Sequence, residues 1–130
     1  LVHAKYAIPD LAANRAICGL SMGGGQSLNI GLGNPELFSR IAAFSAAPNA
    51  EVERMLSLHP SLAGQDWPPV WLCCGLQDEL LEVTRGAEQA LVKAGVDVRA
   101  MYVTGGHDWA VWTYGFRHAL AHFWKEKTHA

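Results

Sequence analysis

The chain has 130 residues, half of them hydrophobic, and its formal net charge is −2. This size and composition predict a single globular domain spanning residues 1–130, with a core of its own. The charge is nearly neutral and Lys and Arg do not cluster, which argues against a nucleic-acid partner. No apolar run reaches the roughly 18 residues of a membrane span, so no membrane association is expected.

Short apolar strands alternate with helices along the chain. After a helical segment at 1–7, strands are predicted at 15–20, 41–45, 70–74 and 96–103. Helices are predicted at 22–32, 51–58, 82–94 and 109–125, with a short helical turn at 35–38. The strands are apolar throughout rather than alternating, which is typical of strands buried on both faces. We therefore predict an α/β fold, with a parallel sheet of about four strands covered by helices on both faces.

The stretch Gly19–Gly25 carries the pattern Gly-x-Ser-x-Gly between a predicted strand and a predicted helix. A serine on such a tight turn is held in a strained conformation, with its hydroxyl pointing out of the fold. We expect side chains at Gly19 and Gly23 to collide where the two backbones approach. The free N–H groups at the start of the helix favour negative charge at Ser21. The pattern therefore indicates Ser21 as a nucleophile.

Two further polar residues follow strands of the predicted sheet, Asp78 after the third and His107 after the fourth. Open parallel sheets bind their ligands beyond the carboxyl ends of the strands, where Ser21 also lies. Serine needs a base to remove its proton, and a histidine base needs a carboxylate to hold its tautomer. We predict Ser21 as nucleophile, His107 as base and Asp78 as acid, in the chain order of the α/β-hydrolase triad. Glu79 and Asp108 are weaker alternatives for the acid.

Acyl transfer also requires an oxyanion hole and a substrate pocket. The backbone N–H of Met22, directly after the serine, is the expected first oxyanion donor. The second normally comes from a loop after an earlier strand, and only a helix is predicted before the serine strand here. Trp109 follows the histidine and is expected to form a wall of the substrate pocket. The core face of the last helix is predicted at helical spacing, by Trp112, Phe116, Ala119, Leu120 and Phe123.

The remaining histidines and cysteines indicate neither a metal site nor a cofactor. His118 and His122 are four residues apart on a predicted helix, which suits two metal ligands, but no third ligand is evident. A plain helix face is therefore favoured for them. Cys18, Cys73 and Cys74 lie in predicted buried strands and are expected to be buried free thiols. They do not distinguish a cytoplasmic protein from a secreted one.

Four segments of the chain resemble a known family. RAICGLSMGGGQSL at 15–28 resembles the nucleophile elbow of the esterase D-like α/β-hydrolases, above all the feruloyl and acetylxylan esterases of carbohydrate esterase family 1. SAAPN at 45–49, CGLQD at 74–78 and GGHDW at 105–109, with Trp112, are similar to later segments of that branch. Enterochelin esterases, S-formylglutathione hydrolases and mycolyltransferases are similar relatives. The resemblance implies the same three roles for Ser21, Asp78 and His107.

The resemblance runs from about Leu1 to Phe123, nearly the whole chain. Family members carry further strands and the second oxyanion donor before the point where this chain begins. The chain is therefore expected to correspond to the C-terminal half of such an enzyme, with those N-terminal strands lacking. Its serine strand would then form a bare sheet edge, which a homodimer could cover.

The leading hypothesis is a serine carboxylic-ester hydrolase that works through an acyl-enzyme and needs no cofactor. Its expected partners are small-molecule or polysaccharide esters: feruloyl or acetyl esters of plant polysaccharide, together with short-chain esters. One alternative is a catalytically incompetent half-domain, or an assembling fragment of such an esterase. Another is an acyltransferase that delivers the acyl group to an alcohol other than water.

Overall fold

Four parallel strands form one sheet in the order β1-β2-β3-β4 in the computed structural model, which describes residues 5–124. The strands are Ala16–Leu20 (β1), Arg40–Phe44 (β2), Val70–Gly75 (β3) and Val98–Val103 (β4). Neighbours in the sheet are consecutive in the chain, so every connection crosses over from the end of one strand to the start of the next. The predicted α/β fold with about four parallel strands is confirmed.

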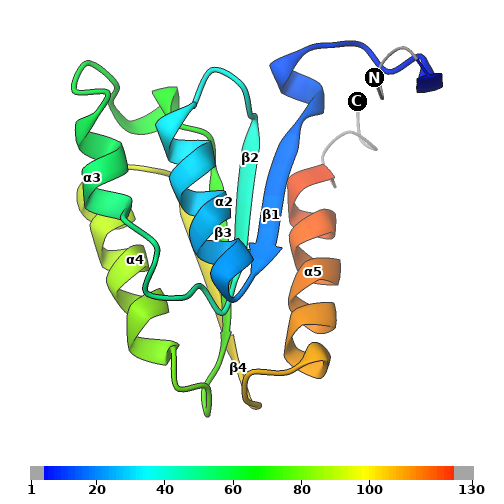
Figure 1. Ribbon diagram of the computed structural model, residues 1–130, viewed down its shortest axis with the longest axis vertical. Helices are drawn as coiled ribbons and strands as arrows, with labels where there is room; N and C mark the ends of the chain where they lie inside the picture. Colours follow the sequence, from blue (N-terminus) through cyan, green and yellow to red (C-terminus); the bar gives the residue numbers. More distant parts are fainter. Residues whose placement is uncertain (1–4, 125–130) are drawn as a thin grey trace.

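Helices cover both faces of the sheet (Figure 1). They are Met22–Gly33 (α2), Val52–Ser57 (α3), Leu81–Lys93 (α4) and Trp109–Trp124 (α5), with 3₁₀ turns at Ala12–Asn14 (η1) and Gly64–Asp66 (η2). In Figure 1, α2, α3 and α4 lie on one side of the sheet and α5 lies alone on the other. Within the part of the chain that is described, no helix is long and apolar enough to cross a membrane.

One predicted helical segment differs from the structure, and another lies mostly outside the described residues. Only the last residues of the segment at 1–7 belong to the described part of the chain, so most of that prediction lies outside it. The segment at 35–38 is a turn rather than a helical turn. The N–H of Leu37 closes it by donating to the carbonyl of Asn34 at 3.0 Å.

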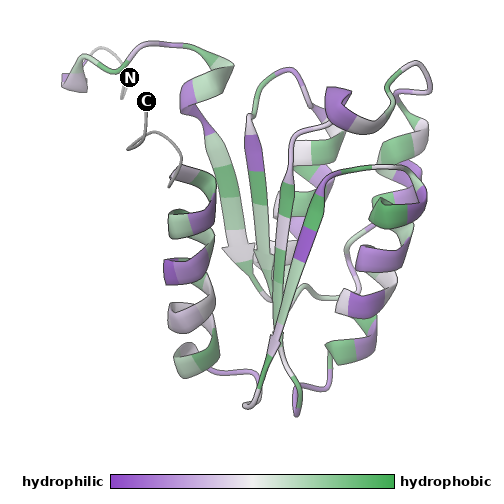
Figure 2. Ribbon diagram, turned by 180° about the vertical axis from the view of Figure 1, so that it is seen from behind, coloured by the Kyte–Doolittle hydropathy of each residue, from purple (hydrophilic) through white to green (hydrophobic). Residues whose placement is uncertain are grey.

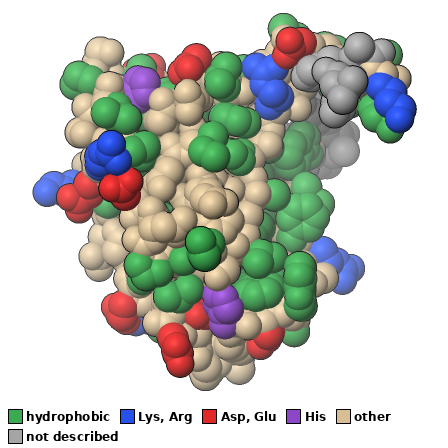
Figure 3. Space-filling view, viewed as in Figure 1, with side chains coloured by type: hydrophobic (Ala, Val, Ile, Leu, Met, Phe, Trp, Pro, Cys, Tyr) green, Lys and Arg blue, Asp and Glu red, His purple; other side chains and the backbone are tan. Residues whose placement is uncertain are grey.

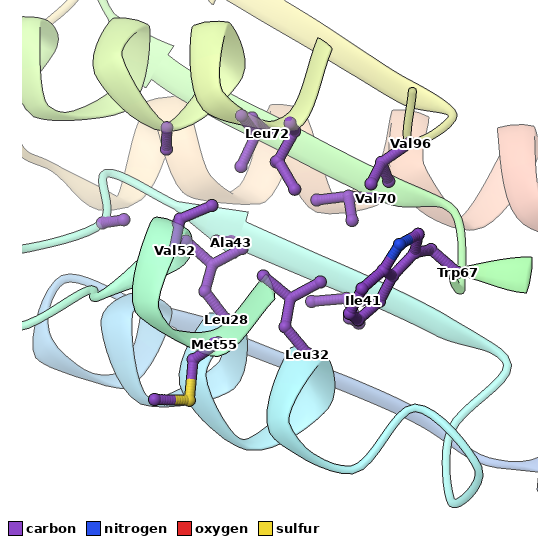
Figure 4. Packing of buried hydrophobic residues seen from close by; sticks show 13 residues of the cluster. Leu28, Leu32, Ile41, Ala43, Val52, Met55, Trp67, Val70, Leu72 and Val96 are labelled. Atoms are coloured by element: carbon purple, nitrogen blue, oxygen red, sulfur yellow. The ribbon is translucent and has the colours of Figure 1, made fainter. Parts of the chain in front are cut away.

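Consecutive residues of β2 contribute to two separate cores. Ile41 and Ala43 belong to the larger core, which lies between the sheet and α2, α3 and α4 (Figure 4). Ala42 and Phe44 belong to the smaller core, beneath α5. Successive side chains of a strand point to opposite faces, so an apolar strand of this kind needs cover on both sides. In Figure 2 the strands are mostly coloured hydrophobic, whereas hydrophilic segments are frequent on the helices.

The edge strands are less buried than the uniform apolar pattern predicts. All six residues of β3 are buried, whereas β1 alternates between exposed and half-buried residues. Cys18 on β1 is exposed, so the prediction of a buried thiol was wrong for this residue and right for Cys73 and Cys74. The predicted core face of α5 was wrong at Phe116 and Leu120, which are 43% and 42% exposed. A strand at the sheet edge has a neighbour on one side only, which an apolar sequence alone does not reveal.

Candidate active site

The turn between β1 and α2 holds Ser21 in an unusual backbone conformation. Its φ is 55° and its ψ is −121°, in a region that residues other than glycine rarely adopt. The N–H of Ser21 donates to the carbonyl of Phe44 at 2.8 Å. Its carbonyl accepts from the N–H groups of Gly24, Gly25 and Ala47 at 3.0 to 3.2 Å. These contacts hold the strained turn that the Gly-x-Ser-x-Gly pattern predicts.

The glycines around Ser21 differ in how much space a side chain would have. A Cβ at Gly19 would lie 2.3 Å from the carbonyl oxygen of Gly23, so the prediction for Gly19 is confirmed. A Cβ at Gly23 would meet nothing within 4 Å, so the same prediction for Gly23 was wrong. A Cβ at Gly25 would lie 2.1 Å from Oδ1 of Asn49, a close approach that the sequence did not reveal.

The structure brings together the three side chains predicted as nucleophile, base and acid. Nε2 of His107 lies 3.0 Å from Oγ of Ser21, and Nδ1 of His107 lies 2.9 Å from Oδ2 of Asp78. An ionised carboxylate only accepts hydrogen bonds, so we assign the imidazole proton to Nδ1. Nε2 is then unprotonated and can accept the hydroxyl proton of Ser21.

The Asp78 carboxyl group is buried, with a side chain that is 1% exposed. Burial opposes its ionisation, but hydrogen bonds from the Leu80 N–H, the Ser45 hydroxyl and His107 favour the charged form. Together with the positive charge that His107 carries when it is protonated, they lower the pKa of Asp78 below its usual value. Leu80 N–H donates to Oδ1 at 2.8 Å. The site therefore keeps Asp78 negatively charged beside the imidazole.

The loop that carries His107 is fastened to the loop that carries Asp78. Oε1 of Gln77 accepts from the N–H of Gly105 at 2.6 Å, and the Gln77 N–H donates to the carbonyl of Gly105 at 2.9 Å. A Cβ at Gly75 would lie 2.2 Å from that carbonyl oxygen, so the two loops approach as closely as glycine allows. Sequence reasoning missed Gln77, although it stands directly before the acid.

Asp108, the alternative acid next to His107, has a structural role. Its Oδ1 accepts from the Val111 N–H at 3.1 Å and its Oδ2 from the Gly106 N–H at 3.3 Å. It therefore caps the first turn of α5. Asp78, rather than the exposed Glu79, is the carboxylate in contact with the imidazole.

Met22 is the first residue of α2, so its N–H lies in the first helical turn, where no intrahelical acceptor is available. The N–H belongs to the residue directly after Ser21, and the Met22 side chain is 63% exposed. Its oxyanion role stays a prediction.

An apolar cavity of about 270 Å³ lies between β1 and the start of α5. Its lining residues are Cys18, Gly19, Leu20, Phe44, Trp109, Trp112, Thr113 and Phe116. Trp109 is 69% exposed and packs edge-on against Trp112, with ring centroids 5.3 Å apart. The cavity adjoins the nucleophile turn through Leu20 and the histidine loop through Trp109. Figure 3 shows hydrophobic side chains gathered on this side of the molecule.

Sequence reasoning also missed Ser45, which follows β2 and is fully buried. Its φ is 50°, and its Oγ accepts from Nε1 of Trp112 at 2.9 Å. The prediction that Trp112 belongs to the core is confirmed, since its side chain is 8% exposed. The only sequence signal for Ser45 was its place in the segment SAAPN.

The two helical histidines contact aromatic rings. His118 lies against Tyr114, with ring centroids 4.4 Å apart, and His122 lies against Trp71 at 5.3 Å. Over residues 5–124, no group of three or more His, Cys, Asp or Glu side chains is arranged to hold a metal ion.

A family model described as "Putative esterase" matches residues 1–123. The chain belongs to this esterase family. Solved structures also resemble it, among them a ferulic acid esterase with a TM-score of 0.76 and 25% identity, a match that covers 94% of this chain and 55% of that one.

Two solved structures with lower sequence identity share the fold. An S-formylglutathione hydrolase from Staphylococcus aureus matches with a TM-score of 0.81 and 20% identity, over 94% of this chain and 55% of its own. An enterobactin esterase from Shigella flexneri matches with a TM-score of 0.76 and 21% identity, over 98% of this chain and 36% of its own. The chain thus spans about half the length of the first two structures and about a third of the last.

Proposed function

We propose that this esterase-family chain hydrolyses carboxylic esters through an acyl-enzyme on Ser21. The observation that carries the proposal is the continuous contact from the Ser21 hydroxyl through His107 to the buried carboxylate of Asp78, at 3.0 and 2.9 Å. Such a chain of contacts converts a weakly nucleophilic hydroxyl into a reactive one. The strained turn at Ser21 supports the same role.

In the first half of the reaction, Oγ of Ser21 attacks the ester carbonyl carbon and its proton passes to Nε2 of His107. The carbonyl oxygen becomes negatively charged and accepts a hydrogen bond from the Met22 N–H. Asp78 stabilises the imidazolium through the Nδ1–H bond. His107 then gives its proton to the alkoxide leaving group as the ester C–O bond breaks, which leaves Ser21 acylated and releases the alcohol.

In the second half, water takes the place of the alcohol. His107 removes a proton from the water as its oxygen attacks the acyl carbon. The tetrahedral intermediate collapses, the bond to Oγ of Ser21 breaks, and Oγ recovers the proton from His107. A carboxylic acid leaves and the resting site is restored, with no cofactor required. An alcohol in place of water would give acyl transfer instead.

For the substrate we propose feruloyl or acetyl esters of plant polysaccharide, with short-chain esters as simpler substrates. The apolar cavity beside the nucleophile turn supports an aromatic acyl group, because Trp109 and Phe116 offer ring surfaces there. At about 270 Å³ it is slightly smaller than the roughly 300–1,000 Å³ of ordinary small-molecule pockets, which suits a single ring. The similarity to a ferulic acid esterase supports the same choice.

The test compares p-nitrophenyl acetate turnover by the purified chain and by Ser21→Ala. We expect turnover that the substitution lowers by about 10³-fold or more, because loss of a triad nucleophile leaves only the contribution of the oxyanion donor and binding. Equal rates in both proteins would sink the proposal. A fluorophosphonate probe should label Ser21; absence of both labelling and turnover would favour the incompetent half-domain instead.

The substrate proposal has a separate test in Trp109→Ala. We expect KM for methyl ferulate to rise roughly 5-fold, since the variant loses one aromatic contact of the kind that contributes about 1 kcal/mol. KM for p-nitrophenyl acetate should change far less, because an acetyl group has no ring to place in the cavity. An equal change for both esters would count against an aromatic acyl site at Trp109.

A further inference from the structure

Ser45 is fully buried in a strained backbone conformation, although it takes no part in bond making or breaking at the site. Its φ of 50° is one that a serine adopts only under constraint, and its side chain has no access to solvent. A glycine would adopt this backbone conformation without strain. The hydroxyl is therefore the part of Ser45 whose role needs an explanation.

The direction of the Ser45 hydroxyl follows from the chemistry of its neighbours. The indole N–H of Trp112 can only donate, so Oγ of Ser45 must be the acceptor in their 2.9 Å contact. The single hydroxyl hydrogen is then available for another acceptor. Ser45 favours the charged forms of both Asp78 and the Cys74 thiol, and of these two neighbours the carboxylate is the stronger acceptor.

Trp112 also touches the base directly. Its ring lies edge-on to His107, with centroids 4.9 Å apart and an interplanar angle of 89°. The side chain is 8% exposed and sits in the core beneath α5. The indole of Trp112 thus makes two contacts. Its ring packs against His107, and its N–H donates to Oγ of Ser45, the serine that supports the acid.

We propose that Trp112 and Ser45 form a positioning pair for the acid and base of the site. Trp112 orients the Ser45 hydroxyl so that its hydrogen is directed at Asp78, and its ring limits the rotation of His107. This inference rests on the proposed function for its catalytic consequence, but not for the contacts themselves. Neither residue takes part in bond making, so both act through Asp78 and His107.

The direct test follows the side-chain carboxyl carbon of Asp78 by NMR during an acid titration of the full chain. In Ser45→Ala we expect the titration midpoint of Asp78 to move upward, because a hydrogen bond that favours the charged form is lost. His107 and Cys74 are the titratable groups that face the same carboxylate, and neither is substituted in this variant. An unchanged midpoint in a folded variant would overturn the proposal.

A second variant separates the hydroxyl from the strained backbone. Ser45→Gly also lacks the hydroxyl but adopts a positive φ without strain, so it should fold even if Ser45→Ala does not. The same upward movement of the Asp78 midpoint is expected in both.

The role of the indole is tested with Trp112→Phe, and Trp71→Phe is the matched control. Trp71 is also 8% exposed, lies in the same core, and its Nε1 has no partner within the described chain. Trp112→Phe should raise the Asp78 midpoint, and Trp71→Phe should not. Equal midpoints in these two variants would show that the indole N–H does not direct the Ser45 hydroxyl.

Measurement of kcat and KM for ester hydrolysis provides an independent test. Ser45 does not line the apolar cavity, so Ser45→Gly should lower kcat about 10-fold and leave KM unchanged, as expected for loss of one hydrogen bond to a charged group. A rise in KM without a fall in kcat would contradict the positioning role. If the Asp78 midpoint moves as expected but wild-type chain turns over no ester, the positioning pair stands and the proposed esterase function falls.

Discussion

Two serines with positive φ stand at the carboxyl ends of neighbouring strands. Ser21 follows β1 and Ser45 follows β2, with φ values of 55° and 50°. Such conformations cost on the order of 1–3 kcal/mol each and persist where the surroundings over-determine them. The N–H of Ser21 bonds to the last residue of β2, and the N–H of Ser45 bonds to Cys73 in β3 at 2.7 Å. Each strained residue is thus held by the adjacent strand of the rigid sheet.

Gly19 and Gly23 form a matched pair of alanine substitutions. Gly19→Ala should destabilise the chain by about 1–3 kcal/mol or more, because the new methyl group would overlap backbone atoms that cannot move aside. Gly23→Ala should be neutral or stabilise it by up to about 1 kcal/mol, since the methyl group enters open space on a helix. Urea denaturation measures both values. Similar losses in the two variants would contradict this account of the turn.

The lowered pKa of Asp78 makes stability depend on pH in a defined direction. The unfolded state takes up the proton first as pH falls, so the contribution of this group is present above its unfolded pKa of about 3.9. It is lost as pH falls through the lower pKa of the folded state. Asp78→Asn should therefore be less stable than wild type at pH 7, with a difference that narrows below about pH 4. The measurement is the free energy of unfolding in urea for wild type and for Asp78→Asn across that pH range. A difference that stays constant with pH would contradict the prediction.

At the scale of the elements, the ends of the strands determine where the chemistry lies. β1, β3 and β4 are parallel, so the loops after them meet at one edge of the sheet. α5 begins two residues after His107, and its first turn therefore influences where the imidazole lies. The Gln77 contacts with Gly105 hold the other end of the same loop.

Removal of the α5 cap should loosen this loop. Asp108→Ala loses the acceptors for the Val111 and Gly106 N–H groups and should cost about 0.5–2 kcal/mol in the free energy of unfolding. Asp108→Asn keeps a side-chain oxygen for the cap and should cost less. Urea denaturation of both variants measures the difference. Equal losses would mean that the side chain does not act as a cap.

At the scale of the whole molecule, the outer side of β1 is uncovered by any other strand of the described chain. The described sheet ends at this strand, and its residues Ala16 and Cys18 are exposed. Exposed hydrophobic side chains lie on the helices at either face, among them Ile30 on α2 and Phe116 on α5. An unprotected strand edge is a template for pairing with another chain. We propose that a second copy pairs along β1.

Light scattering over a range of concentrations tests this pairing. We expect wild type to contain dimers, and Ala16→Lys to shift the population towards monomers, because a charge on an edge strand opposes pairing. Ala13→Lys adds the same charge at an exposed position in η1, outside the strand, and should behave like wild type. A monomer at every concentration, or equal effects of the two lysines, would overturn the proposal.

The sequence determined the order of strands and helices and the identity of the three polar residues at the strand ends. Both depend on local signals: the apolar pattern of each segment and the turn residues between segments. The Gly-x-Ser-x-Gly pattern located the strained turn, because its geometry involves few residues in succession. The fold class followed, since uniformly apolar strands require cover on both faces.

Only the tertiary structure decided which groups meet. It selected Asp78 over Glu79 and Asp108 as the partner of His107, because that choice depends on how two loops 29 residues apart pack together. It also brought the indole N–H of Trp112 within hydrogen-bond distance of Oγ of Ser45, a residue 67 positions away in the chain. Exposure on an edge strand and free space beside a glycine likewise depend on distant segments, since they are properties of what surrounds a residue and not of its immediate neighbours in the chain.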